Sequence, residues 1–388
     1  MLAYALAQYG MMMDDPVRMG AFSRALRQVV TSDCVVLDIG TGAGIFAFLA
    51  CQYGARHVYA IEPNSAIEVA KRLAAANGLS DRITFIQQMS TQVTLPEPAH
   101  VIISDLRGIV PWFEQHIPTI VDARQRLMVP GGVLIPQRDT MWAAVVEAPE
   151  LYHRMVRGWS DQAYRLDMDI ARRIVTSCMG NGRVQPDQLL TAPQLVATLD
   201  YATVEDPNVE VMLQWAAVRT GTAYGVSVWF ERTLADGITV SHAPDAPPDQ
   251  LPPLIIGNAF LPWSAPLTLA AGDTIAFTLQ GTLDGDYIWS WTTKVYDQGK
   301  PDAVKAQFAQ STVFGQPVSL DLLQKQSEDH VPELNEEGQI LQAILSMMDG
   351  ETELETIAQQ VAEAFPQRFA DWEEAMKLVA HVSGQYSE

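Results

Sequence analysis

The sequence predicts an α/β protein in which a doubly wound parallel sheet is followed by an all-β module and a small helical domain. Residues 35–62 alternate strand, glycine turn, helix and strand. Residues 195–297 form short alternating runs separated by Pro, Gly and Asp, and residues 321–388 carry fifteen Asp or Glu against three Lys or Arg in helical patterns. Alternating strands and helices are typical of a parallel sheet with helices on both faces.

Residues 35–62 form the centre of the predicted parallel sheet. The run VVLDIG is apolar and β-branched, as expected of a fully buried strand. Three glycines follow within five positions: Gly40, Gly42 and Gly44. Glycine there lets the chain turn sharply and lets a ligand approach the backbone closely. A helix over 44–53 leads to the strand HVYAIE, whose terminal Glu62 is placed to accept both ribose hydroxyls of a nucleotide.

The spacing of these glycines narrows the kind of ligand. It is G-x-G-x-G rather than the G-x-G-x-x-G of dinucleotide sites, and it is typical of a ligand that has no pyrophosphate. S-adenosylmethionine is such a ligand, so the pattern favours a methyltransferase over a nicotinamide enzyme. A buried strand with a glycine turn and no ligand is the simplest alternative.

The other elements follow in order along the chain. The strands RITFIQQ, HVIISDL and VLIPQ, with a helix near 113–128, extend the parallel sheet. The later short strands predict a barrel or a sandwich. We therefore expect N-terminal helices over 1–33, a Rossmann-like domain over 34–140, a β-barrel over 141–320 with a helical arm at about 151–180, and a small helical domain over 321–388.

Composition excludes several classes of protein. Of the 388 residues, 48% are hydrophobic and 18% are charged, which favours a packed globular protein over a disordered one. The net charge of −21 argues against nucleic acid or an anionic membrane as the partner and is compatible with a cationic or neutral peptide. The three cysteines lack the spacing of metal ligands. Because no signal sequence or long apolar run is present, we expect a soluble, cytoplasmic protein.

Two groups of polar residues flank the predicted site. Arg18 precedes the sheet and is placed to hold the carboxylate of the methionine moiety, with a surface ion pair to Asp15 as the alternative. Asp105 ends the strand HVIISDL, and Glu114 follows nine residues later, where ligands bind in open α/β sheets. Two carboxylates there can grip a cation or a polar amide and draw a proton from nitrogen. Alternatively, Asp105 only caps the end of its strand and Glu114 is a solvated acid.

Residues 9–142 resemble the protein arginine methyltransferase family. DPVR is similar to the family's D-x-x-R, and VVLDIGTGAGIFAFLACQYGARHVYAIE to its S-adenosylmethionine-binding segment. IISDLRGIVPWFE is similar to the segment that carries two glutamates in the family, and ARQRLMVPGGVLIPQRDTMW to the junction with its barrel. The resemblance covers about residues 5–297. It implies a class I methyltransferase that uses S-adenosyl-L-methionine and forms a homodimer through the helical arm.

The resemblance also implies roles for particular residues. Asp105 and Glu114 would be catalytic and would orient the acceptor. The cofactor would be bound by Arg18, Asp38, Gly40, Gly42, Gly44, Glu62, Met89 and Ser104. The acceptor clamp departs from the family, because its first glutamate is Asp105 here, Tyr9 replaces a histidine, and its Thr-His-Trp loop falls at 254–256 on Leu-Ile-Ile. The cofactor site is therefore better retained than the guanidinium site.

The C-terminal domain carries a second resemblance. LNEEGQILQAILSMMDGETELETIAQQVAEAF is similar to the precursor-peptide recognition domain represented by the small pyrroloquinoline-quinone peptide chaperone. The strands that usually precede Asn335 are not evident in the sequence. The resemblance implies docking of a substrate peptide, and a plain helical appendage is the alternative.

These observations predict an N-methyltransferase that acts on a side-chain nitrogen of a protein or peptide, such as an Asn or Gln amide of a ribosomally made peptide. Arginine methylation is one alternative, and a non-catalytic peptide-binding adaptor with a methyltransferase fold is another. Methylation of a carboxylate is disfavoured at this stage, because two acids at 105 and 114 would repel such an acceptor.

Overall fold

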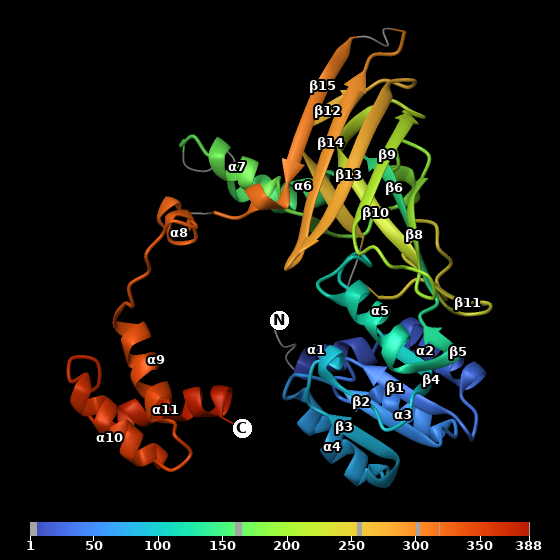
Figure 1. Cartoon of the computed structure of the whole chain (residues 1–388). Coiled ribbons are helices and arrows are strands. Elements are labelled where there is room, and N and C mark those ends of the chain that lie inside the picture. Colours follow the sequence, from blue (N-terminus) through green and yellow to red (C-terminus); the bar gives the residue numbers. More distant parts are fainter. Residues whose placement is uncertain (1–5, 160–164, 254–257, 300–302, 318, 388) are drawn as a thin grey trace. The chain divides into compact units, whose positions relative to one another are not determined.

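The computed structural model describes residues 6–159, 165–253, 258–299, 303–317 and 319–387 (Figure 1). The chain divides into two compact units, residues 1–317 and residues 318–388. In the described part of the chain, no helix combines the length and apolar character needed to cross a bilayer.

The first unit contains a five-stranded parallel sheet. Its strands are β1 (Val35–Ile39), β2 (His57–Ile61), β3 (Ile83–Ile86), β4 (Ala99–Ser104) and β5 (Met128–Ile135), in the order β3-β2-β1-β4-β5. Strand β1 is buried along its whole length, as its apolar, β-branched sequence predicts. Because the chain leaves β1 for β2 on one side and later returns to β4 on the other, the strand order switches at β1. Ligands bind at the carboxyl ends of the strands beside such a switch.

Helices cover this sheet. They are α1 (Leu6–Met13), α2 (Pro16–Val29), α3 (Ile45–Gln52), α4 (Ala66–Ala76) and α5 (His116–Arg126). Asp15 caps α2, because its carboxylate accepts hydrogen bonds from the backbone amides of Val17 and Arg18. Pro16 at the first helical position suits this start, since its missing N–H would have no helical partner.

The second half of the first unit is antiparallel. Its strands are β6 (Arg138–Val146), β7 (Gly180–Asn181), β8 (Gln194–Asp200), β9 (Val209–Ala216), β10 (Gly221–Ala235), β11 (Ile238–Ser241), β12 (Ala259–Leu269), β13 (Thr274–Asp284), β14 (Asp286–Tyr296) and β15 (Val304–Ser311). Their hydrogen bonds make two sheets, β7-β12-β10-β6-β8 with β11 beside β10, and β15-β14-β13-β9. We expected a barrel or a sandwich. The strands form two ladders that share one apolar core, which includes Trp215, Trp263 and Trp291.

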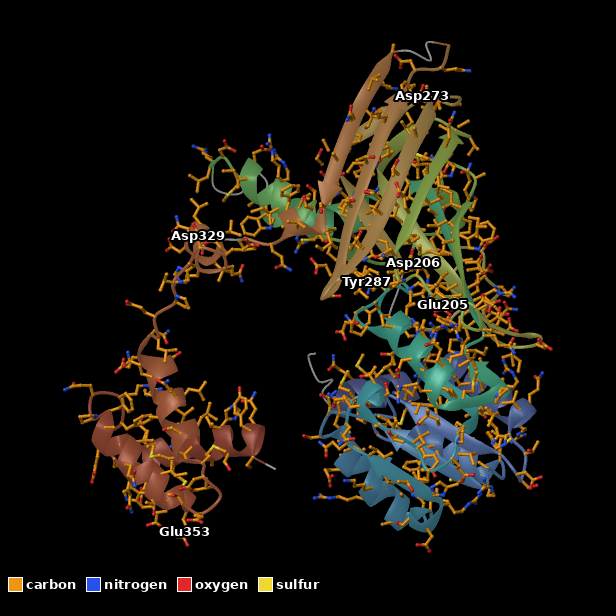
Figure 2. All side chains as sticks on the ribbon, in the orientation of Figure 1. Glu205, Asp206, Asp273, Tyr287, Asp329 and Glu353 are labelled. Carbon is orange, nitrogen blue, oxygen red and sulfur yellow. The ribbon has the colours of Figure 1, made fainter. Side chains whose placement is uncertain are left out.

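The parallel sheet and the β module are joined by polar contacts as well as by packing. Arg124 of α5 forms an ion pair with Glu205 in the loop between β8 and β9 (Figure 2). The same guanidinium donates to the carbonyl oxygens of Tyr201 at 2.8 Å and Val204 at 2.9 Å. These contacts fix α5, and the loop that precedes it, against the β module.

The predicted helical arm contains α6 (Pro149–Val156), the 3-10 helix η3 (Arg157–Trp159) and α7 (Asp169–Val175). We expected Met155, Val156, Trp159 and Tyr164 to form an apolar set that a monomer exposes. That expectation is wrong for Met155 and Val156, because both pack in a cluster of their own chain with Leu151, Tyr152 and Phe260. Tyr164 lies outside the described residues. The large apolar side chains that the arm exposes are Trp159, Leu166 and Ile170.

The second unit is helical. It contains α8 (Leu320–Lys325), α9 (Glu336–Met347), α10 (Leu354–Ala364) and α11 (Trp372–Tyr386), and no strand occurs among its described residues. Asn335 caps α9 by accepting a hydrogen bond from the amide of Gly338 at 2.8 Å. Helices α9, α10 and α11 share their own apolar core, which includes Ile344, Ile357 and Val379.

Candidate functional site

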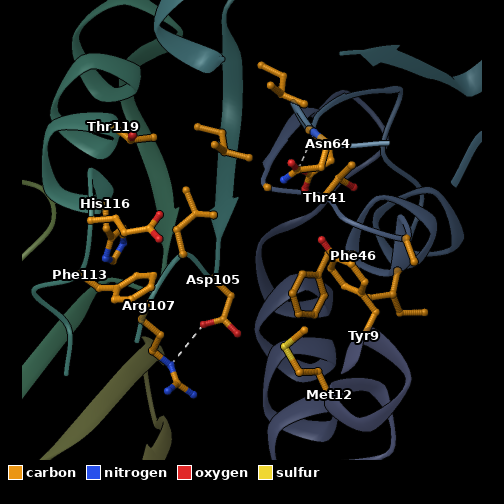
Figure 3. A pocket seen from close by; sticks show the side chains of 18 of the residues that line it. Tyr9, Met12, Thr41, Phe46, Asn64, Asp105, Arg107, Phe113, His116 and Thr119 are labelled. Atoms are coloured by element: carbon orange, nitrogen blue, oxygen red, sulfur yellow. Dashed lines mark hydrogen bonds and ion pairs between the residues drawn. The ribbon is translucent and has the colours of Figure 1, made fainter. Parts of the chain in front are cut away.

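A cavity of about 450 Å³ lies at the carboxyl ends of the central strands of the parallel sheet. Gly40, Glu62 and Asp105, which directly follow β1, β2 and β4, all contribute to its wall. Figure 3 shows Thr41 and Asn64 on one side of this cavity, and Arg107, Phe113 and His116 on the other. The cavity therefore has the position that the sheet topology predicts for a ligand.

The glycine turn after β1 is left-handed at each of its three glycines, with φ of 73° at Gly40, 53° at Gly42 and 91° at Gly44. A Cβ on Gly42 would lie 2.3 Å from the ring of Tyr9. We expected that the bare backbone of Gly42 leaves room for the methionine moiety. The structure shows instead that it leaves room for the tyrosine of α1, which lines the cavity.

Asp38 supports this turn from behind. It is buried, and its Oδ2 accepts hydrogen bonds from the Thr41 hydroxyl at 2.6 Å and from the Ala47 amide at 3.1 Å. Burial raises the pKa of Asp38 to about 7, although these hydrogen bonds oppose the shift. The residues that line the cavity, as far as they are described, do not include Asp38, Gly42, Gly44 or Ser104. The cavity wall therefore gives no evidence that these four residues contact the ligand directly.

Glu62 is held rigidly at the cavity wall. Its Oε2 accepts a hydrogen bond from the Gly42 amide at 3.0 Å, while Oε1 accepts from the backbone and side chain of Asn64 at 3.0 and 2.9 Å. A carboxylate oxygen has two lone pairs, so Oε2 still has one for a further donor. The carboxylate is thus positioned before any ligand arrives.

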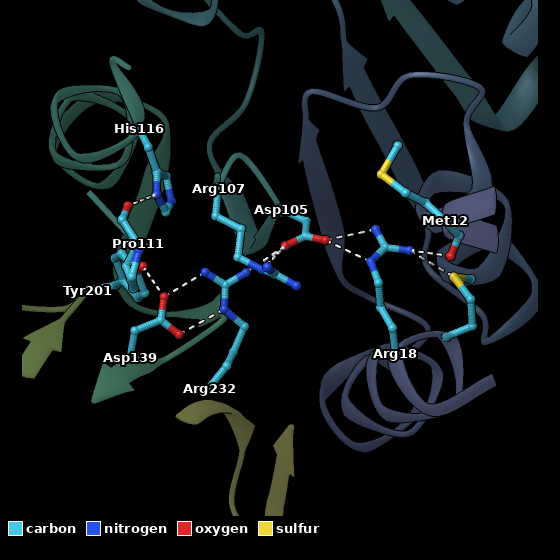
Figure 4. A network of polar contacts seen from close by, with 10 residues as sticks. Met12, Arg18, Asp105, Arg107, Pro111, His116, Asp139, Tyr201 and Arg232 are labelled. Atoms are coloured by element: carbon cyan, nitrogen blue, oxygen red, sulfur yellow. Dashed lines mark hydrogen bonds and ion pairs between the residues drawn. The ribbon is translucent and has the colours of Figure 1, made fainter. Parts of the chain in front are cut away.

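Arg18 reaches the cavity from α2. Its Nε and Nη2 lie 2.9 and 2.8 Å from Oδ2 of Asp105, and its Nη1 donates to the carbonyl oxygen of Met12 at 3.1 Å. The side chain does not pair with Asp15, which caps the helix instead. The alternative of a surface ion pair between Asp15 and Arg18 is therefore wrong. The guanidinium instead lies between Asp105 and the carbonyl oxygen of Met12 (Figure 4), at the wall of the cavity.

Asp105 is surrounded by arginines. Besides Arg18, Arg232 donates to its Oδ1 at 2.5 Å, and Nε of Arg107 lies 3.3 Å from the same oxygen (Figure 4). Burial by itself would raise the pKa of Asp105, but the three guanidinium groups together hold it well below its usual value. We expected a free acid that grips the acceptor. That expectation is wrong for Asp105 in this structure, because the chain's own cations occupy its oxygens.

Arg232 and Asp139 are the residues that sequence reasoning missed. Arg232 donates from Nε and Nη2 to the two oxygens of Asp139 at 2.8 and 2.6 Å, and the Tyr201 hydroxyl donates to the same carboxylate at 2.6 Å. Arg232 and Asp139 are both essentially inaccessible to solvent. Burial would lower the pKa of Arg232, but Asp139 outweighs it and raises that pKa. The available signal was a charged pair, Glu231-Arg232, inside the apolar run GVSVWFERTL.

Arg107 and His116 form the other side of the cavity. Arg107 is 7% exposed, stacks over the Phe230 ring at 5.0 Å, and has no hydrogen-bond partner for Nε or Nη1 among the described residues. Burial lowers the pKa of Arg107 to about 10 and that of His116 to about 4. His116 Nδ1 lies 3.2 Å from the Pro111 carbonyl oxygen and donates to it.

Glu114 and Met89 also line the cavity, as expected of site residues. Glu114 has a positive φ of 41°, which is uncommon for a residue with a side chain and is often retained at functional sites. The Leu-Ile-Ile segment at 254–256 lies outside the described residues.

Comparisons with known proteins agree with this architecture. Residues 23–159 match the family model of the ribosomal protein L11 methyltransferase, and residues 137–280 match that of the arginine methyltransferase oligomerization subdomain. Protein arginine N-methyltransferase 1 of Chlamydomonas reinhardtii is 29% identical over 58% of this chain and 67% of its own length. A probable histone-arginine methyltransferase CARM1 of Oryza sativa is 32% identical over 61% of this chain and 48% of its own. The chain spans about half to two thirds of the length of the curated relatives that it matches.

Solved structures share the fold. Protein arginine methyltransferase 10 of Arabidopsis thaliana has a TM-score of 0.68 at 21% identity, covering 79% of this chain and 98% of its own. The PRMT1 enzyme–prozyme complex of Trypanosoma brucei, solved with AdoHcy, has a TM-score of 0.67 at 21% identity, covering 78% and 96%. The sheet order, the glycine turn and the acid after β2 form a Rossmann-like nucleotide-binding fold. In sequence and in fold the chain is similar to the protein arginine methyltransferases, as the sequence resemblance predicted.

Proposed function

We propose that this protein is an S-adenosylmethionine-dependent methyltransferase that acts on a side chain of a protein or peptide. The observation that carries the proposal is the pre-positioned Glu62 carboxylate, which is held by the Gly42 amide and Asn64 at the wall of the cavity beyond β2. The PRMT-type relatives and the related structure solved with AdoHcy support the same cofactor.

The cofactor, when bound, supplies an electrophilic methyl group, and the chain contributes positioning and electrostatics. Glu62 would accept one ribose hydroxyl through the free lone pair of Oε2. Arg18, which lines the cavity from α2 and pairs there with Asp105, would orient the carboxylate of the methionine moiety. Phe46 stacks on the Arg18 guanidinium at 5.2 Å and helps to hold it there.

The alternative functions differ in the chemical group that accepts the methyl group. The relatives are named as arginine methyltransferases, and these names favour a guanidinium acceptor over the Asn or Gln amide that we expected. The three arginines around Asp105 argue against a guanidinium acceptor, because Arg232 already occupies Asp105, the first acid of the expected clamp. The retained glycine turn and Glu62 favour a catalytic function over a non-catalytic adaptor. No partner class other than protein or peptide is proposed, since the net charge of −21 disfavours nucleic acid and anionic membranes.

We also propose a symmetric homodimer assembled through the helical arm. The family model that describes an oligomerization subdomain spans residues 137–280 and includes this arm. Ile170 is 78% exposed on α7, and Trp159 and Leu166 are exposed beside it. An exposed apolar set of this kind is typical of an interface between copies.

Calorimetric titration of the full-length protein with S-adenosylhomocysteine tests the proposed cofactor. We expect saturable binding that Glu62→Gln weakens by about tenfold, through loss of a charge-assisted hydrogen bond. Glu68→Gln, which changes an exposed acid of α4, is the matched control and should bind like the wild type. Absence of binding in the wild type, or equal binding by Glu62→Gln, would overturn the assignment.

A further inference from the structure

One acid in the wall of the cavity has no partner among the described residues. The acids that line the cavity are Asp15, Glu62, Asp105 and Glu114. Asp15 caps α2, Glu62 accepts from backbone amides, and Asp105 accepts from two arginines. Glu114 makes no hydrogen bond or ion pair with any residue that the structure describes. Its carboxylate is therefore the acid that a ligand in this cavity can still use.

The backbone of Glu114 is held from both sides. Gln115 donates from Nε2 to the carbonyl oxygen of Gly285, in the turn between β13 and β14, at 2.8 Å. On the other side, the Phe113 ring packs against Gly108, where a Cβ would lie 2.4 Å from the ring. These neighbours keep Glu114 at its uncommon positive φ of 41°. The carboxylate is thus placed at the cavity wall before any ligand arrives, as a binding group requires.

The charges of the cavity wall favour a cationic acceptor. Among the described residues of the wall, four acids face two arginines, Arg18 and Arg107, which leaves two negative charges. The two histidines of the wall are neutral, because burial lowers the pKa of both. S-adenosylmethionine brings one net positive charge, since it carries a sulfonium, an ammonium and a carboxylate. One negative charge remains, and a singly charged cation balances it, whereas a carboxylate or an amide does not.

One free carboxylate suits a primary ammonium better than a guanidinium. A guanidinium presents five N–H donors in a rigid fork and stays protonated in proteins. Because Arg18 and Arg232 already use Asp105, a guanidinium acceptor would leave several of these donors unpaired. A lysine ammonium has only three donors, and its ordinary pKa of about 10.4 allows it to lose a proton. Burial in the cavity and the charge of Arg107 on the same wall both lower that pKa.

Arg107, Phe113 and Glu114 form what we call the acceptor half of the cavity. Asp105 lies between Arg107 and Arg18 (Figure 4), and Figure 3 shows Phe113 on the same side as Arg107. The cavity is also lined by the proline pair at 252–253, which precedes β12. Apolar surface of this kind covers the methylene stem of a lysine side chain while an acid takes the charged end.

We propose that the acceptor is a primary amine, such as that of a lysine side chain, which Glu114 binds and deprotonates. This inference rests on the proposed function, since it names the substrate class of the same site. A proton leaves the ammonium for an oxygen of Glu114, and the freed electron pair of nitrogen forms the new N–CH₃ bond. The S–CH₃ bond breaks, and its electron pair stays on sulfur. The products are a methylated ammonium and S-adenosylhomocysteine, and Glu114 releases its proton to solvent.

Methyl transfer by the full-length protein, followed by mass spectrometry, tests this proposal. The acceptors are the N-acetyl, N-methylamide derivatives of lysine, arginine and glutamine, together with alanine N-methylamide. The free α-amine of the alanine derivative distinguishes a terminal amine from a side-chain amine. We expect kcat/KM for the preferred amine to exceed that for the arginine and glutamine derivatives by at least about tenfold.

The role of Glu114 is tested by the pH dependence of its variant. Glu114→Gln should lower kcat/KM for the amine by about a hundredfold at a pH of about 7, the size of a general-base contribution. The loss should shrink as the pH approaches about 10, because the amine is then free without help from Glu114. A merely structural role would not produce this recovery. Glu210→Gln, which changes an exposed acid of β9, is the matched control and should behave like the wild type at both pH values.

Calorimetric titration with S-adenosylhomocysteine separates the possible failures. No binding to the wild type would refute the proposed function itself. Binding without methylation of either amine, or with a preference for the arginine or glutamine derivative, would overturn only the amine acceptor. Weaker S-adenosylhomocysteine binding by Glu114→Gln would also overturn it, because Glu114 would then serve the cofactor, and so would a loss of activity that is the same at every pH. Thermal melting of each variant confirms that the compared proteins are folded.

Discussion

Arg232 of β10 lies opposite Asp139 of β6 in the antiparallel ladder, and its guanidinium donates two hydrogen bonds, of 2.8 and 2.6 Å, to the Asp139 carboxylate. This pair fixes the guanidinium whose third nitrogen reaches Asp105. The buried pair of the β module therefore acts with Arg18 and Arg107 to lower the pKa of an acid that follows β4 of the parallel sheet.

Breaking this pair should destabilise the protein strongly. Asp139→Ala leaves a buried, uncompensated guanidinium, and we expect the free energy of unfolding to fall by about 3–5 kcal/mol. Arg138, on the same strand as Asp139, forms an exposed ion pair with Asp200 of β8 at 3.5 Å. Asp200→Ala removes this pair and should lower the free energy of unfolding by at most about 1 kcal/mol. Urea denaturation of both variants measures the difference. Equal, small effects would show that the buried pair is not structural.

The glycine turn can be tested with two glycines that both have a positive φ. Gly42→Ala places a Cβ in the Tyr9 ring, so we expect displacement of α1 and loss of S-adenosylhomocysteine binding by about tenfold or more. Gly54→Ala also has a positive φ, but its Cβ would meet nothing within 4 Å. It should lower stability by about 1 kcal/mol and leave binding intact. Binding losses of the same size in both variants would mean that backbone strain, not contact with Tyr9, is responsible.

Asp38 should make stability depend on pH. Its pKa is raised by burial from 3.8 to about 7, so the folded protein retains a proton that the unfolded chain releases between these values. The contribution of Asp38 to stability is therefore fully favourable below pH of about 4 and is lost as the pH rises to about 7. Relative to the wild type, Asp38→Asn should gain stability across this window, by an amount on the order of a few kcal/mol. A constant difference between pH 4 and 8 in denaturation experiments would contradict the raised pKa.

If the helical arm forms the dimer interface, a new charge on the arm should separate the dimer, whereas a new charge on the β module should not. Ile170→Asp, on α7, should convert the dimer to a monomer in light scattering at micromolar concentration. Met212→Asp, on β9, changes a side chain of similar exposure, 80% against 78%, and should leave the dimer unchanged. A monomeric wild type would refute the assembly, and a dimeric Ile170→Asp variant would place the interface elsewhere.

Residues 318–388 should fold by themselves, because α9, α10 and α11 enclose their own apolar core. We expect helical circular dichroism and a cooperative thermal transition from the isolated fragment. Val361→Asp, in that core, should remove the transition, whereas Glu363→Ala on the same helix should not. A fragment without helical signal would show that the unit depends on the rest of the chain.

Local patterns in the sequence were sufficient to predict the parallel sheet, the glycine turn after β1 and the place of Glu62 at the end of β2. Strand β1, the left-handed glycines and Glu62 all lie within residues 35–62, where the identity of each residue restricts its own backbone. The acceptor half was not predictable in this way. Arg232 is 127 residues from Asp105 and 93 from Asp139. The register of β10 on β6 pairs Arg232 with Asp139, and the packing of the β module on the parallel sheet brings Arg232 to Asp105. Burial then decides the charges, because a guanidinium removed from water must find an anion. The sequence alone therefore determined that a methyl-donor site exists, and the tertiary structure decided which charges face the acceptor.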